Sequence, residues 1–174
     1  MRNKSDKPTN TPQGVELEYN SLRNEILKRI ELRQQLISIT LTLAGVFLSF
    51  GLATDLVALI YPPLAAFLAI GWVQNDRAIQ NLAIYIREKL ETRPIGLGYE
   101  TYIQQKRERS KKLGGRRFIV MSHAGIFLFT QLMALGIELS KSVSFPFSFL
   151  KWALLVIDLV SMVVVVWVVR RARR

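Results

Sequence analysis

The chain has 174 residues, half of them hydrophobic, and its 24 Lys and Arg against 13 Asp and Glu give a net charge of +11. It has no cysteine, which excludes a disulfide scaffold, a cysteine-ligated zinc domain and a thiol enzyme. The apolar fraction is too high for a disordered chain. Basic and apolar residues are separated along the sequence, as is typical of a polytopic membrane protein, so we expect an all-α membrane protein.

The N-terminal segment divides into two parts. Residues 1–14 are polar and contain prolines, so we expect a disordered cytoplasmic arm. Residues 15–35 carry apolar side chains at helical spacing, and no proline or glycine interrupts the chain before Gly45. We therefore expect one amphipathic cytoplasmic helix that continues into the first membrane span. Its apolar face consists of Val15, Tyr19, Leu22, Ile26, Ile30 and Ile37.

Four apolar segments are long enough to cross a hydrocarbon core of about 30 Å at about 1.5 Å per residue. They run from Leu36 to Thr54, Leu56 to Val73, Phe118 to Ile137 and Phe149 to Val169. Only Asp55 separates the first two segments. We expect four transmembrane helices in two hairpins, residues 36–73 and 118–169.

The basic residues predict the orientation of these spans. Seven of the 24 Lys and Arg precede the first span, eleven lie in residues 74–117 and four in the tail, residues 170–174, which leaves only Lys141 and Lys151 for the hairpin tips. The positive-inside rule places both termini and the central segment in the cytoplasm. Without sorting signals, a bacterial inner membrane is the expected location. Trp72, Trp152 and Trp167 stand near span ends, where aromatic anchors are expected.

The central segment, residues 74–117, predicts two basic cytoplasmic helices. The first carries Ile79, Leu82, Ile86 and Leu90 on one face. A loop at residues 94–98 follows, and a shorter helix begins near Tyr99. We expect the apolar faces of this segment and of residues 15–35 to be buried against one another or against a neighbouring subunit, which gives a small membrane-proximal helical domain.

Asp158 is the most informative polar residue in the spans, because it is expected near the membrane midplane. An ionised carboxylate there costs about 2.5–3.5 kcal/mol on insertion scales. We therefore expect a neutral Asp158 that packs against the second span, where Pro62 and Pro63 are expected to kink the helix and free backbone carbonyls, and where Tyr61 adds a hydroxyl. A proton- or cation-responsive site and a structural interhelical lock both fit this placement.

The third span carries further polar groups. His123 is expected about 9 Å inside the cytoplasmic boundary, too far from Asp158 for a direct pair. A relay through Thr130 and Gln131 stays open. With one histidine and no cysteine, we expect no metal site and no cofactor.

Small residues recur on one face of each of the first two spans. Both rows are spaced by 4, 3 and 4 positions, and they consist of Ser38, Thr42, Gly45 and Ser49 on the first span and Ala58, Pro62, Ala65 and Ala69 on the second. Small faces allow close helix packing in lipid. We expect the two rows to pack against each other; alternatively, the hydroxyls of the first row line a pore in an oligomer.

A basic run follows the cytoplasmic helices. It contains Lys106, Arg107, Arg109, Lys111, Lys112, Arg116 and Arg117. These charges can bind anionic lipid head groups, although the positive-inside rule alone accounts for them. Aromatic interleaving and a nucleic-acid fold are missing, so we expect no nucleic-acid partner.

The functional expectation follows from this architecture. No catalytic motif is present, and the glycines at positions 96 and 98 lack the rest of a phosphate-binding fingerprint, so we expect no enzyme. We expect a homo-oligomer that conducts ions or perturbs the membrane under the control of its cytoplasmic helices. One alternative is a small proton-coupled transporter that uses Asp158. The other is a non-conducting scaffold that recruits a cytoplasmic protein.

Overall fold

In a computed structural model of the chain, residues 12–54, 56–92, 98–109, 115–141 and 147–172 are described. The regular structure of this part is helical throughout. The elements are α1 (Pro12–Ala53), the 3₁₀ turn η1 (Val57–Ile60), α2 (Tyr61–Tyr85), the π-helical turn η2 (Ile86–Leu90), α3 (Tyr99–Arg109), α4 (Gly115–Leu139) and α5 (Phe147–Ala172). The all-α class expected from the sequence is confirmed.

Four helical stretches in the described part are long and apolar enough to cross a membrane. They are Gln13–Ala53, Val57–Leu90, Val120–Leu139 and Phe149–Arg171. α4 and α5, with 25 and 26 residues, are each about 38 Å long, enough for a hydrocarbon core of about 30 Å. α1 has 42 residues and is about 63 Å long, so it extends well beyond such a core.

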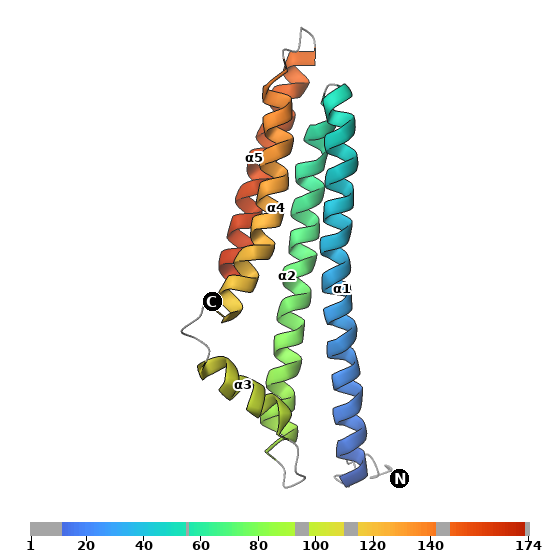
Figure 1. Ribbon diagram of the computed structural model, residues 1–174, viewed down its shortest axis with the longest axis vertical. Helices are drawn as coiled ribbons and strands as arrows, with labels where there is room; N and C mark the ends of the chain where they lie inside the picture. Colours follow the sequence, from blue (N-terminus) through green and yellow to red (C-terminus); the bar gives the residue numbers. More distant parts are fainter. Residues whose placement is uncertain (1–11, 55, 93–97, 110–114, 142–146, 173–174) are drawn as a thin grey trace, which may run out of the picture.

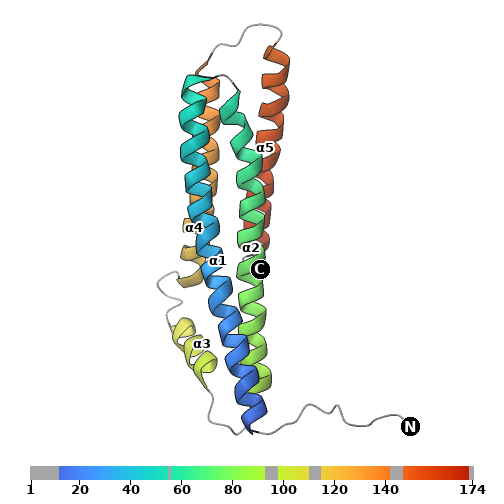
Figure 2. The same cartoon turned by 90° about the vertical axis from the view of Figure 1, so that its right-hand side faces the viewer.

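The helices run side by side along one long axis (Figures 1 and 2). α1 and α2 are antiparallel and form the longest part of the molecule. α4 and α5 lie beside the end of this pair where α1 ends and α2 begins, and α3 lies near its opposite end, obliquely to the long helices (Figure 1). The molecule is thus a four-helix bundle at one end and a two-helix stalk with α3 at the other.

The bundle is held together by apolar side chains that converge on α2. One cluster joins Trp72 and Val73 of α2 to α4 and α5. The predicted small row of the second span is buried throughout, from Ala58 to Ala69, which lets neighbouring helices approach closely. α1 closely approaches η1 at Gly51, where an added Cβ would lie 2.6 Å from the Cβ of Ala58.

The stalk has a hydrophobic core of its own. Its cluster contains Val15, Ile26, Ile86 and Leu90, with Tyr19, Leu22, Ile30, Ile79 and Leu82 packed against it. These are the side chains of the two predicted apolar faces, so the predicted packing of the faces is confirmed. Ile37, the last member of the first face, packs instead against the cluster around Trp72.

Three local features differ from the sequence-based expectation. Residues 12–14 belong to the first turn of α1 rather than to a disordered arm; residues 1–11 lie outside the described part. Pro62 and Pro63 lie in the first turn of α2, where a missing backbone N–H breaks no helical bond, so they begin the helix and do not kink it. Trp72 is fully buried and is no boundary anchor, whereas Trp152 and Trp167 are exposed.

Candidate functional site

A central polar layer crosses the middle of the bundle. The Tyr61 hydroxyl donates to Oγ1 of Thr130 at 2.7 Å, and Thr130 in turn donates to the carbonyl of Ile126 at 2.9 Å. One position further along α4, Nε2 of Gln131 donates to the carbonyl of Pro62 at 3.0 Å. Both interhelical bonds are buried, so this layer ties the start of α2 to α4.

Asp158 of α5 belongs to the same layer by helix register. Leu59 of η1, directly before α2, shares one cluster with Leu135 and Leu155, and this contact aligns the start of α2 with α4 and α5. Measured from this cluster along the bundle axis, Asp158 lies three positions from Leu155, or about 4.5 Å. Gln131 lies four positions from Leu135 in the same direction, or about 6 Å. Asp158 is therefore level with Gln131, and its side chain is fully buried.

The donor and acceptor count of this layer is unbalanced. Neither carboxylate oxygen of Asp158 has a hydrogen-bond partner among the described residues, and the Oε1 of Gln131 has none there either. The predicted hydrogen bond from Asp158 to Tyr61 or to a freed carbonyl of Ala58 or Leu59 is not formed. The Tyr61 hydroxyl donates to Thr130 instead, and the backbone N–H of Tyr61 donates to the Ala58 carbonyl. Buried polar groups without partners are costly, so this layer is the prime candidate for a functional site.

A second polar group lies where the stalk meets the bundle. Arg33 of α1 and Asp76 of α2 form an ion pair at 2.8 Å, and Nε2 of Gln80 also donates to Asp76 at 2.7 Å. The Arg33 guanidinium lies 5.9 Å from the ring centre of Trp72. Trp72 also stacks with the half-buried His123, with ring centres 5.0 Å apart. Side-chain contacts within this group therefore connect α1, α2 and α4.

His123 is thus placed by an aromatic contact and not by Asp158. It lies eight positions from Gln131 on α4, about 12 Å along the helix axis. Since Asp158 is level with Gln131, a direct pair with His123 is ruled out, as the sequence had indicated.

At the opposite end of the bundle, Glu138 holds the turn between α1 and α2. Its Oε1 accepts from the backbone N–H of Leu56 at 3.1 Å, and Leu56 has a left-handed backbone with φ 67°. Lys141 donates to the carbonyls of Gly51 and Thr54. Cations at helix C-termini offset the helix dipole, so Lys141 stabilises the end of α1.

Lys151 of α5 stabilises the C-terminal end of α4 in the same way. Its Nζ donates to the carbonyls of Glu138 and Lys141 at 2.8 Å and 2.7 Å, at the end of α4. The two lysines near the predicted hairpin tips therefore serve as helix caps.

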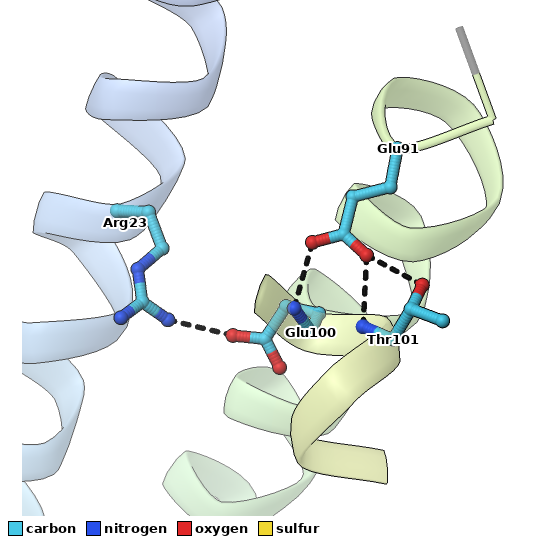
Figure 3. Close-up of polar contacts among 4 residues, drawn as sticks. All are labelled: Arg23, Glu91, Glu100 and Thr101. Atoms are coloured by element: carbon cyan, nitrogen blue, oxygen red, sulfur yellow. Dashed lines mark hydrogen bonds and ion pairs between the residues drawn. The ribbon is translucent and has the colours of Figure 1, made fainter. Parts of the chain in front are cut away.

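α3 is attached to the stalk by a small polar latch, drawn in Figure 3. The Glu91 carboxylate accepts from the backbone N–H groups of Glu100 and Thr101 at 2.7 Å and 2.8 Å and from the Thr101 hydroxyl at 2.6 Å. Arg23 of α1 forms an ion pair with Glu100 at 2.6 Å and lies 4.3 Å from the ring centre of Tyr99. Glu91 thus caps the N-terminus of α3 from outside the helix.

The first small row points away from the rest of the chain. Ser38, Thr42, Gly45 and Ser49 are all exposed, and we call them the outward row. The expected packing of this row against the second span is wrong, because α1 contacts α2 with its opposite face, through larger side chains such as Leu43 and Phe47. Of the four spanning stretches, that of α1 is the least covered, with 17% of its apolar window buried.

The predicted lipid-binding run is described in part. Lys106 is exposed on α3. Arg107 and Arg109 lie in α3, and Arg116 and Arg117 in the first turn of α4, but their side chains are outside the described part. Lys111 and Lys112 lie outside it altogether.

Sequence reasoning missed Arg33, Asp76, Glu91 and Glu138 as partners. The signal for Asp76 and Glu138 was available, because each is an acid at the end of an apolar stretch and such acids are buried only when partnered. Their partners are distant in sequence, 43 positions for Arg33 with Asp76 and 82 for Leu56 with Glu138. Only a folded chain reveals such pairs.

No group of three or more potential metal ligands occurs among the residues that the structure describes. The chain matches no family model, no curated protein and no solved structure. The functional argument therefore rests on the geometry described above.

Proposed function

We propose that this chain is an integral membrane protein whose copies associate through the outward row of α1 into an assembly that conducts ions or perturbs the membrane. The supporting observation is the exposure of Ser38, Thr42, Gly45 and Ser49 on the side of α1 opposite its core. In lipid, small and hydroxyl side chains favour close helix contacts and interhelical hydrogen bonds. A single protomer has its core filled by side chains, so a conducting path requires several copies.

The cytoplasmic helices control this assembly through α1 itself. α1 is one uninterrupted helix from the stalk core to the end of the bundle. A rotation or tilt of the stalk is therefore transmitted to the outward row. The ion pair of Arg33 with Asp76 lies at the junction and keeps α1 and α2 in register there.

The proposed orientation follows the positive-inside rule, with both termini, the stalk and α3 in the cytoplasm of a bacterium and the bundle in its inner membrane. Exposed Trp152 and Trp167 lie near opposite ends of α5, where interfacial aromatics are expected. The Arg171 guanidinium lies 5.3 Å from the ring centre of Trp167, close to the proposed level of the lipid head groups. Anionic lipids are the proposed partners of Lys106 and the basic run.

A substitution at Gly45 tests the assembly. An added Cβ at Gly45 has no other atom within 4 Å, so Gly45→Leu fits the protomer but fills the proposed contact between copies. We expect the variant to keep the wild-type melting temperature of the monomer and to lose oligomer mass and ion flux in liposomes. Val46→Leu, at the adjacent exposed position, is the matched control and retains both. A Gly45→Leu protein with wild-type oligomer mass refutes this interface.

Single cysteines map the same contact, because the chain has none of its own. Ser38→Cys and Ser49→Cys are expected to form disulfides between copies in the membrane under mild oxidation. Ile39→Cys, exposed but off the row, is expected to form none. Equal cross-linking at all three positions contradicts a defined α1 interface.

Asp158 favours a second candidate function, a proton-coupled transporter. The observation is its full burial with both carboxylate oxygens lacking a partner among the described residues. Asp158→Asn is then expected to abolish proton-coupled uptake in liposomes while the oligomer mass is unchanged. Unaltered proton flux in Asp158→Asn removes this candidate.

A further inference from the structure

The central polar layer holds buried acceptors that face no donor. Gln131 donates its amide nitrogen to the Pro62 carbonyl, which fixes the orientation of its side-chain amide and leaves Oε1 as an acceptor. The two Asp158 oxygens, when ionised, are acceptors as well. All three atoms are buried without a partner in the described part of the chain, and helix register puts them at one level. Two acceptor groups cannot bond to each other unless a proton is added.

We propose that Asp158 and Gln131 form a proton-binding site, in which the protonated Asp158 carboxyl donates to Oε1 of Gln131, directly or through one water molecule. The hydrogen bonds then run from Asp158 to Gln131 and from Gln131 to the carbonyl of Pro62. One bound proton links α5, α4 and α2 in this way. The site is independent of whether copies associate through α1.

The surroundings of Asp158 supply no alternative partner. Of the titratable groups on the helices packed against α5, Tyr61 donates its proton to Thr130. Glu138 and His123 lie seven and eight positions from Gln131 on α4, in opposite directions, about 10 Å and 12 Å along the axis. No described Lys or Arg has an ion pair or hydrogen bond with Asp158. An ionised Asp158 is therefore uncompensated, and the neutral acid is the stable form in this layer.

Loss of the proton removes the link between α5 and α4. An ionised Asp158 repels the partial negative charge on Oε1 of Gln131, and its burial without a cation favours hydration of the layer. The contact of α5 with α4 then weakens. The site thus makes the closed packing of the bundle depend on a proton.

Infrared spectroscopy of the full chain in phosphatidylcholine and phosphatidylglycerol liposomes tests the site. With ¹³C in the aspartate carboxyl groups, we expect a protonated aspartate band at pH 7 that disappears in Asp158→Asn. Gln131→Met, which keeps the side-chain length but removes the acceptor, is expected to move this band to higher frequency. Glu138→Gln is the matched control and leaves it unchanged. Absence of the band from the wild type overturns the proton site, and an unshifted band in Gln131→Met overturns the pairing.

Thermal unfolding gives an independent readout. Asparagine carries an amide donor in place of the acid proton, so Asp158→Asn is expected to melt close to the wild type at pH 5 and to show no loss from this site as the pH rises. The wild type is expected to lose stability relative to Asp158→Asn between pH 5 and pH 9. Asp158→Leu, which has no donor, melts below Asp158→Asn. A constant difference between wild type and Asp158→Asn across this pH range contradicts the proposal.

Discussion

Removal of the Glu91 carboxylate is expected to detach α3 from the stalk. Glu91 accepts three hydrogen bonds, from the N–H groups of Glu100 and Thr101 and from the Thr101 hydroxyl. A single capping interaction contributes about 1 kcal/mol, and the freed N–H groups are near enough to the surface to reach water, so Glu91→Ala is expected to cost about 2–3 kcal/mol of docking free energy. At about 1.4 kcal/mol per factor of ten, the equilibrium constant for docking of α3 falls about 30-fold to 140-fold.

Hydrogen exchange measured by mass spectrometry on a peptide covering residues 99–106 follows this change. We expect exchange in α3 to accelerate by about that factor in Glu91→Ala and by less in Glu91→Gln, which keeps one acceptor oxygen. Glu88→Ala is the control, because Glu88 is exposed and pairs only with Arg87 among its described ion pairs. If Glu91→Ala leaves exchange in α3 unchanged, or if Glu88→Ala accelerates it equally, the latch is not what holds α3.

The same latch has a pH dependence whose sign follows from the pKa of Glu91. Burial alone raises this pKa, but the hydrogen bonds from Thr101 and Glu100 and the positive charge of Arg23 outweigh burial and lower it from its usual 4.5. A lowered pKa in the folded state means that the stabilisation is complete above pH 4.5 and is lost as the pH falls through the lowered value. Exchange in α3 is therefore expected to be constant from pH 5 to 7, after correction for the intrinsic rate, and to accelerate in acid.

Two further predictions concern packing between α1 and the rest of the bundle. Arg33→Met leaves the Asp76 carboxylate, with 8% side-chain exposure, without its ion-pair partner, and Asp76→Asn leaves the Arg33 guanidinium, with 19%, without its own. Each is expected to cost about 3 kcal/mol, whereas the double variant costs less than their sum; additive losses in thermal unfolding contradict this pairing. Gly51→Ala is expected to cost about 1–3 kcal/mol, because its Cβ would lie 2.6 Å from that of Ala58. Gly136→Ala, a helical glycine of α4 with no atom within 4 Å of the added Cβ, is the control, and equal melting temperatures of the two glycine variants refute the close approach.

The helices and their apolar faces were predictable from the sequence. The face that carries Val15 and Ile26 and the face that carries Ile86 and Leu90 were identified by helical spacing, and they form the stalk core. Such a face depends only on the 3.6-residue period and on the length of the apolar stretch, which are local properties. The four stretches long enough to span a membrane were found in the same way.

The predicted packing of the outward row against the second span was wrong for a physical reason. Small residues at spacings of 4, 3 and 4 show that Ser38 and Ser49 share a face, but they do not say what that face contacts. In the structure the opposite face of α1 meets the bundle, with Thr40 and Ala44 buried and Phe47 packed beside Ala44. This face is selected by contacts with the other helices, which no spacing within α1 encodes. The row is consequently left exposed.

Local sequence determines which residues share a helix and a face of that helix, while the rotation and axial offset of each helix are set by contacts between helices. The offset set by Leu59, Leu135 and Leu155 brings Asp158 level with Gln131, which no spacing in the sequence indicates. The ion pair of Arg33 with Asp76, across 43 positions, depends on the same kind of alignment. The four helices long and apolar enough to span a membrane could therefore be predicted from the sequence, whereas the candidate proton site was recognised only from the packing of the helices against one another.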